Sequence, residues 1–417
     1  MAETLAELFS ATRTQSVKLC RHLTTEDFGL QGAAFASPPK WHLAHTSWFF
    51  ETFLLKPHLP DYPEWNPAFE SLFNSYYNGV GEPFPRHQRG LLSRPSLDEV
   101  LEYRQHVDSH MQALLQDESH PQHRQVLQRC RLGIEHERQH QELFFTDLKF
   151  SLSLNPLLPG AFPALPATTG SHAPPELSWQ HFNGGVVDVG YSGEDFAFDN
   201  ESPRHPAYLQ PFELASRLVS NSEYQAFIDD GGYRNPELWL ADGWATVEDL
   251  QWRAPLYWLD RAREGEVYSL HGVIPRHPDA PVCHLSAYEA DAYARWACAR
   301  LPTEQEWEHA AAPEPVACPG MDDDIYHPLP ARGQQRPLEQ LYDSCWQWTR
   351  SAYTPYPGFS PPSGAIGEYN GKFMSNQWVL RGGSCVSNAG QLRASYRNFF
   401  YPADRWQFSG LRLARDA

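Results

Sequence analysis

The sequence of 417 residues lacks several features that would assign it to other classes of protein. No apolar run approaches the roughly 20 residues of a membrane span, so we expect no transmembrane helix and no membrane partner. The N-terminal stretch MAETLAELFSATRTQ has neither a charged region nor an apolar core, which predicts no signal peptide and a cytoplasmic location. The net charge is −18 and no basic patch is visible, which argues against a nucleic-acid partner.

Paired cysteines are also missing. The chain has seven cysteines, an odd number, and no two of them form a C-x-x-C pair. This pattern argues against a secreted disulfide framework and against a zinc site built from cysteines. We expect reduced and mostly buried thiols. Cys345 and Cys385, which lie in Trp- and Gly-rich surroundings, have no role that the sequence assigns.

Hydrophobic spacing divides the chain into two domains. Residues 1–155 predict an all-α four-helix bundle, because apolar residues recur at three- and four-residue spacing. Ser96 and Glu99 form a capping box at one helix start. Residues 156–178 hold six prolines and predict an extended linker. Residues 179–417 are rich in Trp, Gly and Pro, with short strands, and predict an α+β domain. The expected long helices cover residues 4–23, 40–55, 96–116 and 123–154.

The stretch His136-Glu137-Arg138-Gln139-His140 supports two chemistries. Residues i and i+4 of a helix share a face, so His136 and His140 can bind one metal ion. The segment is also H-E-x-x-H, the zinc-protease signature, with Glu137 as general base. That signature needs a third ligand downstream, but Glu142 is too close and the next glutamate, Glu176, lies beyond the prolines of the linker. A zinc hydrolase or a zinc-dependent DinB-type thiol transferase therefore remains only an alternative.

A third ligand is available upstream. Trp41-His42-Leu43-Ala44-His45 places two histidines on an apolar helix, and we expect at least one of them to bind the metal. Three histidines from two helices would leave open coordination positions. Neutral imidazoles with vacant positions suit Fe(II) and O2 chemistry, although ligand type alone does not exclude zinc.

These stretches resemble a known family. PPKWHLAHTSWFFE followed by HERQHQE is very similar to the DinB-like domain of the ergothioneine-biosynthesis sulfoxide synthases (EgtB type). The resemblance assigns His45, His136 and His140 as iron ligands, leaves His42 outside the triad, and makes Glu142 the acid that orients a ligating imidazole. FNGGVVDVG, ARLPTEQEWEHAA and VLRGGS resemble the family's second domain, which is of the formylglycine-generating-enzyme type with a C-type-lectin-like core. A formylglycine-generating enzyme itself fits poorly, because only Cys385 follows the R-G-G-S segment.

The resemblance implies an enzyme that uses Fe(II) and O2 to form a carbon–chalcogen bond at C2 of the imidazole of hercynine. The donor is a thiol, cysteine or γ-glutamylcysteine, in the sulfoxide synthases. It is a selenol from a selenosugar in a sister group, the selenoneine synthases. A noncatalytic binding module is a further hypothesis, since lectin-like domains often bind ligands.

The resemblance also implies roles around the metal. Gln139 corresponds to the residue that hydrogen-bonds the substrate imidazole. Tyr76 and Tyr77, in Asn74-Ser75-Tyr76-Tyr77, match active-site tyrosines of one branch, and a phenol with an ordinary pKa near 10 can donate a proton. The other branch places its tyrosine just before V-L-R-G-G-S. That region reads Asn376-Gln377-Trp378 here, so we expect that tyrosine to be absent.

Substrate contacts are expected from two further segments. Arg86 and Arg89 match an arginine pair that holds the carboxylates of the donor. Asn398 is a candidate for the betaine end of hercynine, and Phe399 offers an aromatic face for its trimethylammonium group. Two departures leave the donor open: Phe400 stands where the other branch has an aspartate, and Asp343-Ser344-Cys345-Trp346-Gln347-Trp348-Thr349 replaces D-V-W-E-W-T.

Overall fold

The computed structural model describes residues 3–165, 175–318, 321, 324–333 and 336–417. The chain forms two compact units. The first comprises Met1–Ala161 and Pro362–Tyr369, and the second comprises Phe162–Pro361 and Asn370–Ala417. Residues 166–174 of the predicted linker lie outside the described part. Pro362–Tyr369 groups with the helices although the sequence analysis placed it in the second domain.

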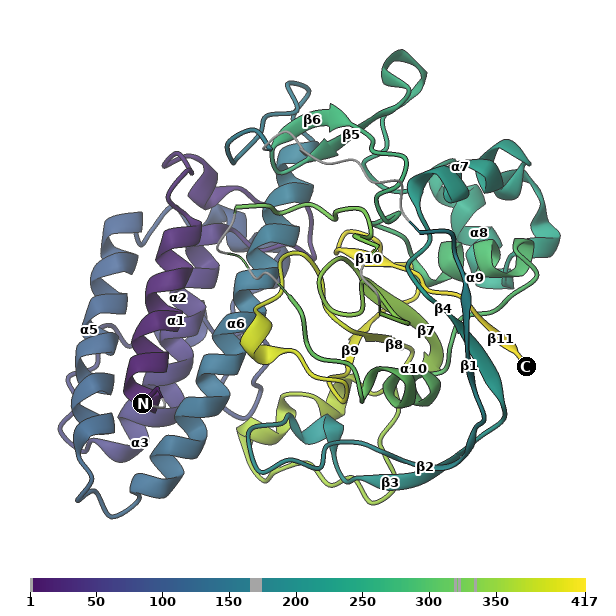
Figure 1. Cartoon of the computed structure of the whole chain (residues 1–417). Coiled ribbons are helices and arrows are strands. Elements are labelled where there is room, and N and C mark those ends of the chain that lie inside the picture. Colours follow the sequence, from purple (N-terminus) through teal and green to yellow (C-terminus); the bar gives the residue numbers. More distant parts are fainter. Residues whose placement is uncertain (1–2, 166–174, 319–320, 322–323, 334–335) are drawn as a thin grey trace. The chain divides into compact units, whose positions relative to one another are not determined.

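The first unit is an all-α bundle, as predicted. Four long helices run alongside one another (Figure 1): α1 (Leu5–Leu19), α2 (Pro39–Phe50), α5 (Leu97–Gln116) and α6 (His123–Ser153). Two short helices follow α2, namely α3 (Lys56–His58) and α4 (Phe69–Leu72). The predicted capping box of Ser96 and Glu99 starts α5, and Pro39 occupies the first turn of α2, where a missing N–H costs nothing. A π-helical turn over Glu51–Leu55 continues α2.

A glycine sets the close approach of α6 to α2. A Cβ added at Gly133 would lie 2.4 Å from Cε1 of Phe50, so only glycine lets the two helices meet at this point. His136 follows Gly133 after three residues and therefore lies on the same face of α6. The contact thus directs the metal-binding face of α6 towards α2.

The second unit is α+β, as predicted. Its helices are α7 (Asn221–Asp229), α8 (Ala241–Leu250), α9 (Ala287–Trp296) and α10 (Glu304–Ala311). Its strands are β1 (Trp179–Phe182), β2 (Gly185–Val189), β3 (His205–Leu209), β4 (Phe212–Ala215), β5 (Glu266–Ser269), β6 (Gly272–Pro275), β7 (Trp346–Ala352), β8 (Trp378–Arg381), β9 (Asn398–Phe400), β10 (Ser409–Gly410) and β11 (Ala414–Asp416).

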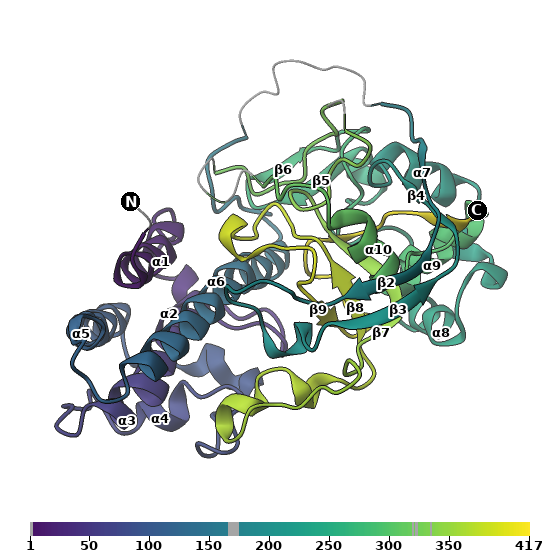
Figure 2. The ribbon, with the colours of Figure 1, turned by 60° about the horizontal axis from the view of Figure 1, so that its bottom comes forward.

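The largest sheet of the second unit has the strand order β10-β7-β8-β9. β7 pairs antiparallel with β8, its neighbour in Figure 2, and parallel with β10. Both α9 and α10 contact β7. The other described sheets have the orders β1-β4-β11, β2-β3 and β5-β6. No helix in the described part of the chain is both long and apolar enough to cross a membrane.

Buried ion pairs hold the centre of the second unit. Glu304 at the start of α10 accepts hydrogen bonds from Arg381 at 2.8 Å and from Arg397 at 2.9 Å. All three side chains are buried. Because an unpaired buried charge is costly, each residue of this set requires the others. The L-P-T-E-x-E-W and V-L-R-G-G-S segments are therefore motifs that hold the fold together.

Candidate metal centre

The three predicted ligands come together between α2 and α6. His45 lies on α2, and His136 and His140 lie one turn apart on α6. One potential ligand atom from each lies within 4.8 Å of the others, and Nε2 of His45 is 3.2 Å from Nε2 of His136. The sequence pattern therefore located a real cluster of three imidazoles.

The environment keeps these imidazoles neutral. Burial lowers the pKa of His136 to about 3. Burial also lowers the pKa of His45 and of His140 well below the ordinary value, and the neighbouring histidines add to the effect. Metal binding requires the unprotonated ring, so the three side chains are ready to act as ligands. A set of three nitrogen donors with further positions open fits Fe(II).

His45 is fixed in its orientation. Its Nδ1–H donates to the carbonyl oxygen of Phe73 at 2.6 Å, which leaves the Nε2 lone pair facing the cluster. The ring also stacks between two indoles, Trp41 at a centroid distance of 4.5 Å and Trp48 at 5.4 Å. The tautomer and the plane of this ligand are therefore set before any metal arrives.

Glu137 does not serve the cluster. Its carboxylate accepts hydrogen bonds from Arg13 and Arg104, each at 2.9 Å, and from Ser16 at 2.6 Å. Burial alone would raise its pKa, but the two guanidinium groups lower it to about 2. A carboxylate held in this way is a structural anion and a poor general base. This geometry removes the support for the H-E-x-x-H hydrolase interpretation.

The tyrosine pair lies on a loop that an asparagine shapes. The side chain of Asn74 donates to the carbonyls of Tyr77 and Gly81 and accepts from the N–H of Tyr77, all within 3.1 Å. Tyr77 is fully buried and packs against Phe53 and Trp48, and burial raises its pKa well above the ordinary value. Tyr76 stacks on Tyr77 at 4.6 Å and is only partly buried.

A third tyrosine, which the sequence analysis missed, lies beside the cluster. The ring of Tyr369 is 5.7 Å from the ring of His136, and its hydroxyl donates to Oε1 of Gln139. The segment is anchored by Glu368, whose carboxylate accepts the backbone N–H groups of Asn78 and Gly79. The tyrosine that the other branch of the family carries just before V-L-R-G-G-S is absent, because Asn376-Gln377-Trp378 stands there. Tyr369, which precedes this segment, supplies another phenol. No local pattern in the sequence marks it.

The two predicted arginines differ in burial. Arg86 is exposed, whereas Arg89 is only 2% exposed. Arg89 lies over Trp41, with Cζ 3.4 Å from the ring centroid, and donates from Nη1 to Ser37 at 2.8 Å. Its Nε and Nη2 have no hydrogen-bond partner among the described residues. Burial and neighbouring Arg86 lower the pKa of Arg89, an effect that an anionic ligand would reverse.

The remaining candidates belong to the second unit. Asn398 and Phe399 start β9, where Oδ1 of Asn398 accepts the N–H of Phe399 at 2.9 Å. Phe399 stacks on Tyr353 with centroids 4.0 Å apart. Their roles towards hercynine stay predictions. Gln347 is fully buried, and its amide bonds Trp307, Arg412, Leu341 and Gln340. Gln347, which replaces the glutamate of the family pattern, therefore belongs to the hydrogen-bonded core of the second unit.

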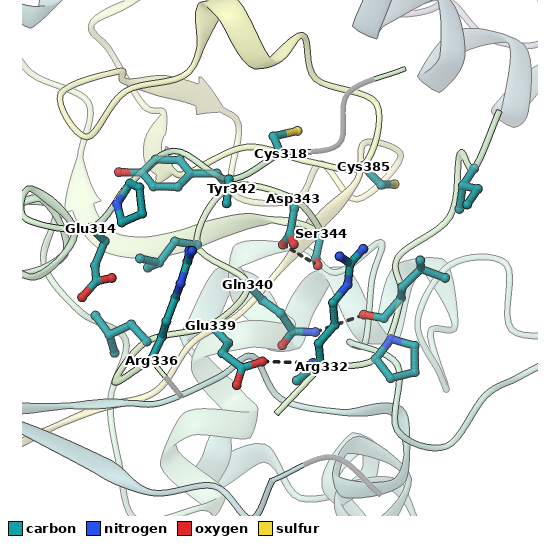
Figure 3. A pocket seen from close by; sticks show the side chains of 18 of the residues that line it. Glu314, Cys318, Arg332, Arg336, Glu339, Gln340, Tyr342, Asp343, Ser344 and Cys385 are labelled. Atoms are coloured by element: carbon teal, nitrogen blue, oxygen red, sulfur yellow. Dashed lines mark hydrogen bonds between the residues drawn. The ribbon is translucent and has the colours of Figure 1, made fainter. Parts of the chain in front are cut away.

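The second unit also contains a cavity of about 340 Å³. Figure 3 shows Cys318 and Cys385 on one side of it and Arg332 with Glu339 on another. Burial raises the pKa of Asp343 in its wall. Cys385, to which the sequence assigned no role, is thus a wall residue of this cavity, while Cys345 is fully buried. Among the described residues, the only group of three or more potential ligands is the histidine cluster.

Comparison with known proteins agrees with this architecture. Residues 8–144 match the DinB superfamily, and residues 177–322 and 337–417 match the sulfatase-modifying factor enzyme 1-like domain. A hercynine oxygenase of Mycolicibacterium smegmatis is 32% identical over 99% of this chain and 99% of its own length. Another, of Mycolicibacterium thermoresistibile, is 33% identical over 91% of this chain and 87% of its own length.

A formylglycine-generating enzyme of Streptomyces coelicolor is 34% identical to this chain, but over only 28% of the chain and 41% of the enzyme. The full-length similarity is therefore to the hercynine oxygenases. The chain belongs to the hercynine oxygenase (EgtB-type) family, as an oxidative enzyme that joins a DinB helical domain to a formylglycine-generating-enzyme-like domain.

Proposed function

We propose that this protein uses Fe(II) and O2 to form a carbon–sulfur bond at C2 of the imidazole of hercynine, as an ergothioneine-type sulfoxide synthase. The observation that carries the proposal is the buried cluster of His45, His136 and His140 in a chain similar to hercynine oxygenases along its whole length. Fe(II) held by these imidazoles would supply one-electron chemistry with O2, which zinc lacks.

The residues around the cluster have separable tasks. Gln139 lies between the two ligands of α6 and has an amide suited to hydrogen-bond a substrate imidazole. Tyr369, whose ring lies 5.7 Å from that of His136, and Tyr76, which stacks on Tyr77, are our candidates for the phenol that holds or donates a proton at its hydroxyl oxygen. Burial raises the pKa of Tyr77 well above its ordinary value, and its packing against Phe53 and Trp48 suits a wall of the site.

The environment of Arg89 favours a thiol donor that carries a carboxylate over a selenosugar donor. A buried guanidinium with two unsatisfied donors is costly unless an anion completes it. Cysteine and γ-glutamylcysteine carry a carboxylate that would satisfy Nε and Nη2 in a bidentate manner. A selenosugar, the donor of a selenoneine synthase, has no carboxylate. Arg86, which is exposed, would contribute long-range attraction for the donor.

The test is a competition. The protein is loaded anaerobically with Fe(II) and given hercynine together with cysteine, γ-glutamylcysteine and a 1-seleno-sugar, and O2 is then admitted. Mass spectrometry should find an O2-dependent sulfoxide of hercynine joined to one of the two thiols. A selenium product in preference to both sulfur products would reverse the assignment of the donor. The absence of any O2-dependent product would refute the function.

A further inference from the structure

His140 is connected to a buried carboxylate through His42. Nδ1 of His140 is 2.9 Å from Nδ1 of His42, and Nε2 of His42 is 3.1 Å from Oδ2 of Asp147. The same oxygen accepts the backbone N–H of Ser37 at 2.8 Å. His42 is 5% exposed and Asp147 is 1% exposed, so water competes little for these hydrogen bonds.

Helical spacing explains why the groups meet. His42 and His45 are three residues apart on α2 and therefore share a face. His140 and Asp147 are seven residues apart, two turns along the same face of α6. On the facing sides of the two helices, His45 and His140 therefore belong to the metal cluster, and His42 and Asp147 lie behind His140.

With a neutral imidazole at His42, the donors and acceptors along this series of hydrogen bonds allow one direction. Asp147 accepts from Ser37 and has only oxygens to offer, so His42 donates to it from Nε2. Nδ1 of His42 is then an acceptor, and His140 must donate from its own Nδ1. That tautomer leaves the lone pair of His140 on Nε2, which is the atom available to a metal. The reverse direction would put a proton on Nε2 of His140 and block that atom.

The three histidines therefore differ in the hydrogen-bond partner of Nδ1, the ring nitrogen that faces away from the metal cluster. Nδ1 of His45 donates to a neutral carbonyl, and Nδ1 of His136 has no partner among the described residues. Within the same described part of the chain, His140 is the ligand that leads to a carboxylate, through His42. Hydrogen bonding to an anion raises the basicity of a ligating imidazole. The cluster is thus asymmetric in electron donation, with His140 as its strongest donor.

We propose that His42 and Asp147 are positioning residues that fix His140 as an Nε2 ligand and transmit the negative charge of Asp147 to the metal. The family resemblance gave the orienting task to Glu142, and we assign it to this pair instead. The proposal rests on the proposed iron site, but it requires neither hercynine nor a donor, so it can be tested apart from the reaction.

The test uses the full-length protein, freed of metal with a chelator and titrated with Co(II) and, anaerobically, with Fe(II). We expect His42→Phe, which removes both hydrogen bonds, to weaken metal binding by about 10–100-fold and to change the visible Co(II) spectrum. His42→Asn keeps an acceptor oxygen for Nδ1–H of His140 and should recover part of the affinity. His58→Phe, at another buried histidine of the same unit, is the matched control.

A second variant, Asp147→Asn, isolates the charge. The amide that it introduces retains an oxygen that can accept from Ser37 and His42, so the tautomer survives while the negative charge is lost. We expect the Fe(III)/Fe(II) potential to rise, because a negative charge near the metal stabilises the ferric form. Wild-type affinity and Co(II) spectrum in His42→Phe would overturn the positioning role, as would an equal loss in His58→Phe. An unchanged potential in Asp147→Asn would overturn the transmission of charge.

The two proposals fail separately. If the metal measurements come out as expected and no product forms with hercynine, the reaction is refuted and the positioning role stands. If hercynine is converted and His42→Phe binds metal normally, the reverse holds.

Discussion

Tyr369 donates a hydrogen bond from its hydroxyl to the side-chain oxygen of Gln139, although 230 positions separate the two residues. The bond uses one lone pair of Oε1 of Gln139, and the amide nitrogen of that side chain can only donate. An N–H donor at this position would suit the unprotonated nitrogen of the substrate imidazole that we propose as its partner. Tyr369 thus orients Gln139 as well as bringing a phenol to the metal cluster.

Replacing Tyr369 by phenylalanine should lower kcat by about 10²–10⁴-fold, the usual contribution of a positioned proton donor. Tyr76→Phe tests the alternative donor under the same conditions, and single-turnover mixing with O2 measures both. Tyr62→Phe provides a control, because its hydroxyl donates to Glu51 and not to a residue of the metal cluster. A kcat unchanged in Tyr369→Phe and strongly reduced in Tyr76→Phe would transfer the proton-donor role to Tyr76.

Arg89→Lys should raise KM for cysteine or γ-glutamylcysteine by about 10–100-fold, because one lost charged hydrogen bond is worth about 1.5–3 kcal/mol. Arg86→Lys, at the exposed arginine, should change KM far less. Cysteamine, which lacks the carboxylate, gives the decisive comparison. Wild type and Arg89→Lys should use it equally poorly, and a persistent difference between them would mean that Arg89 acts on something other than the carboxylate.

Glu137→Gln should lower the free energy of unfolding of the helical unit by about 3–5 kcal/mol at neutral pH, because it removes the carboxylate shared by two buried arginines and leaves Arg13 with Asp108 alone. The folded pKa of Glu137, about 2, is below its ordinary value of 4.5. Its stabilisation is therefore complete above pH 4.5 and is lost as the pH falls towards 2.

The gap between wild type and Glu137→Gln should accordingly shrink on acidification below pH 4.5. Urea unfolding of the metal-free proteins, followed at neutral and at acid pH, measures it. Equal stability of the two proteins at neutral pH would contradict the structural role. A peptidase activity abolished by the substitution would restore the hydrolase interpretation.

Gly133→Ala should destabilise the bundle by about 1–3 kcal/mol and weaken Co(II) binding, because the new methyl group collides with the ring of Phe50. Gly29→Ala, where an added Cβ meets nothing within 4 Å, is the matched control. Phe50→Leu in the Gly133→Ala background should return part of the lost metal affinity by making room. Failure of that double variant to recover would show that the helix approach is not what the methyl group disturbs.

The sequence predicted most of the first unit because its signals are local. The four helices, the capping box at Ser96 and the histidines at i and i+4 all depend on spacing within a few residues. His42 was visible as a histidine on an apolar helix, but its partner Asp147 lies on another helix, so the connection emerged only from the fold. The sequence analysis did not identify Tyr369 for the same reason, because a contact between residues 230 positions apart cannot be predicted from local spacing.

The assignments made by resemblance also depended on contacts that only the fold shows. Arg86 and Arg89 look equivalent in the sequence, and only burial distinguishes the solvated one from the one with unsatisfied donors. Gln347 looked like a change at a ligand site, yet its amide lies in the hydrogen-bonded core. A departure from a family pattern therefore gains meaning only once its neighbours are known.

Pro362–Tyr369 belongs to the same compact unit as the helices that precede Ala161. On the ribosome, the four helices and all three histidines emerge long before this segment does. A fragment that ends near Ala161 would therefore contain the whole metal-binding triad and lack both Tyr369 and the carboxylate of Glu368 that anchors the Tyr76 loop. Nascent chains could acquire metal early, while the phenol beside it arrives only after Phe162–Pro361 has been synthesised.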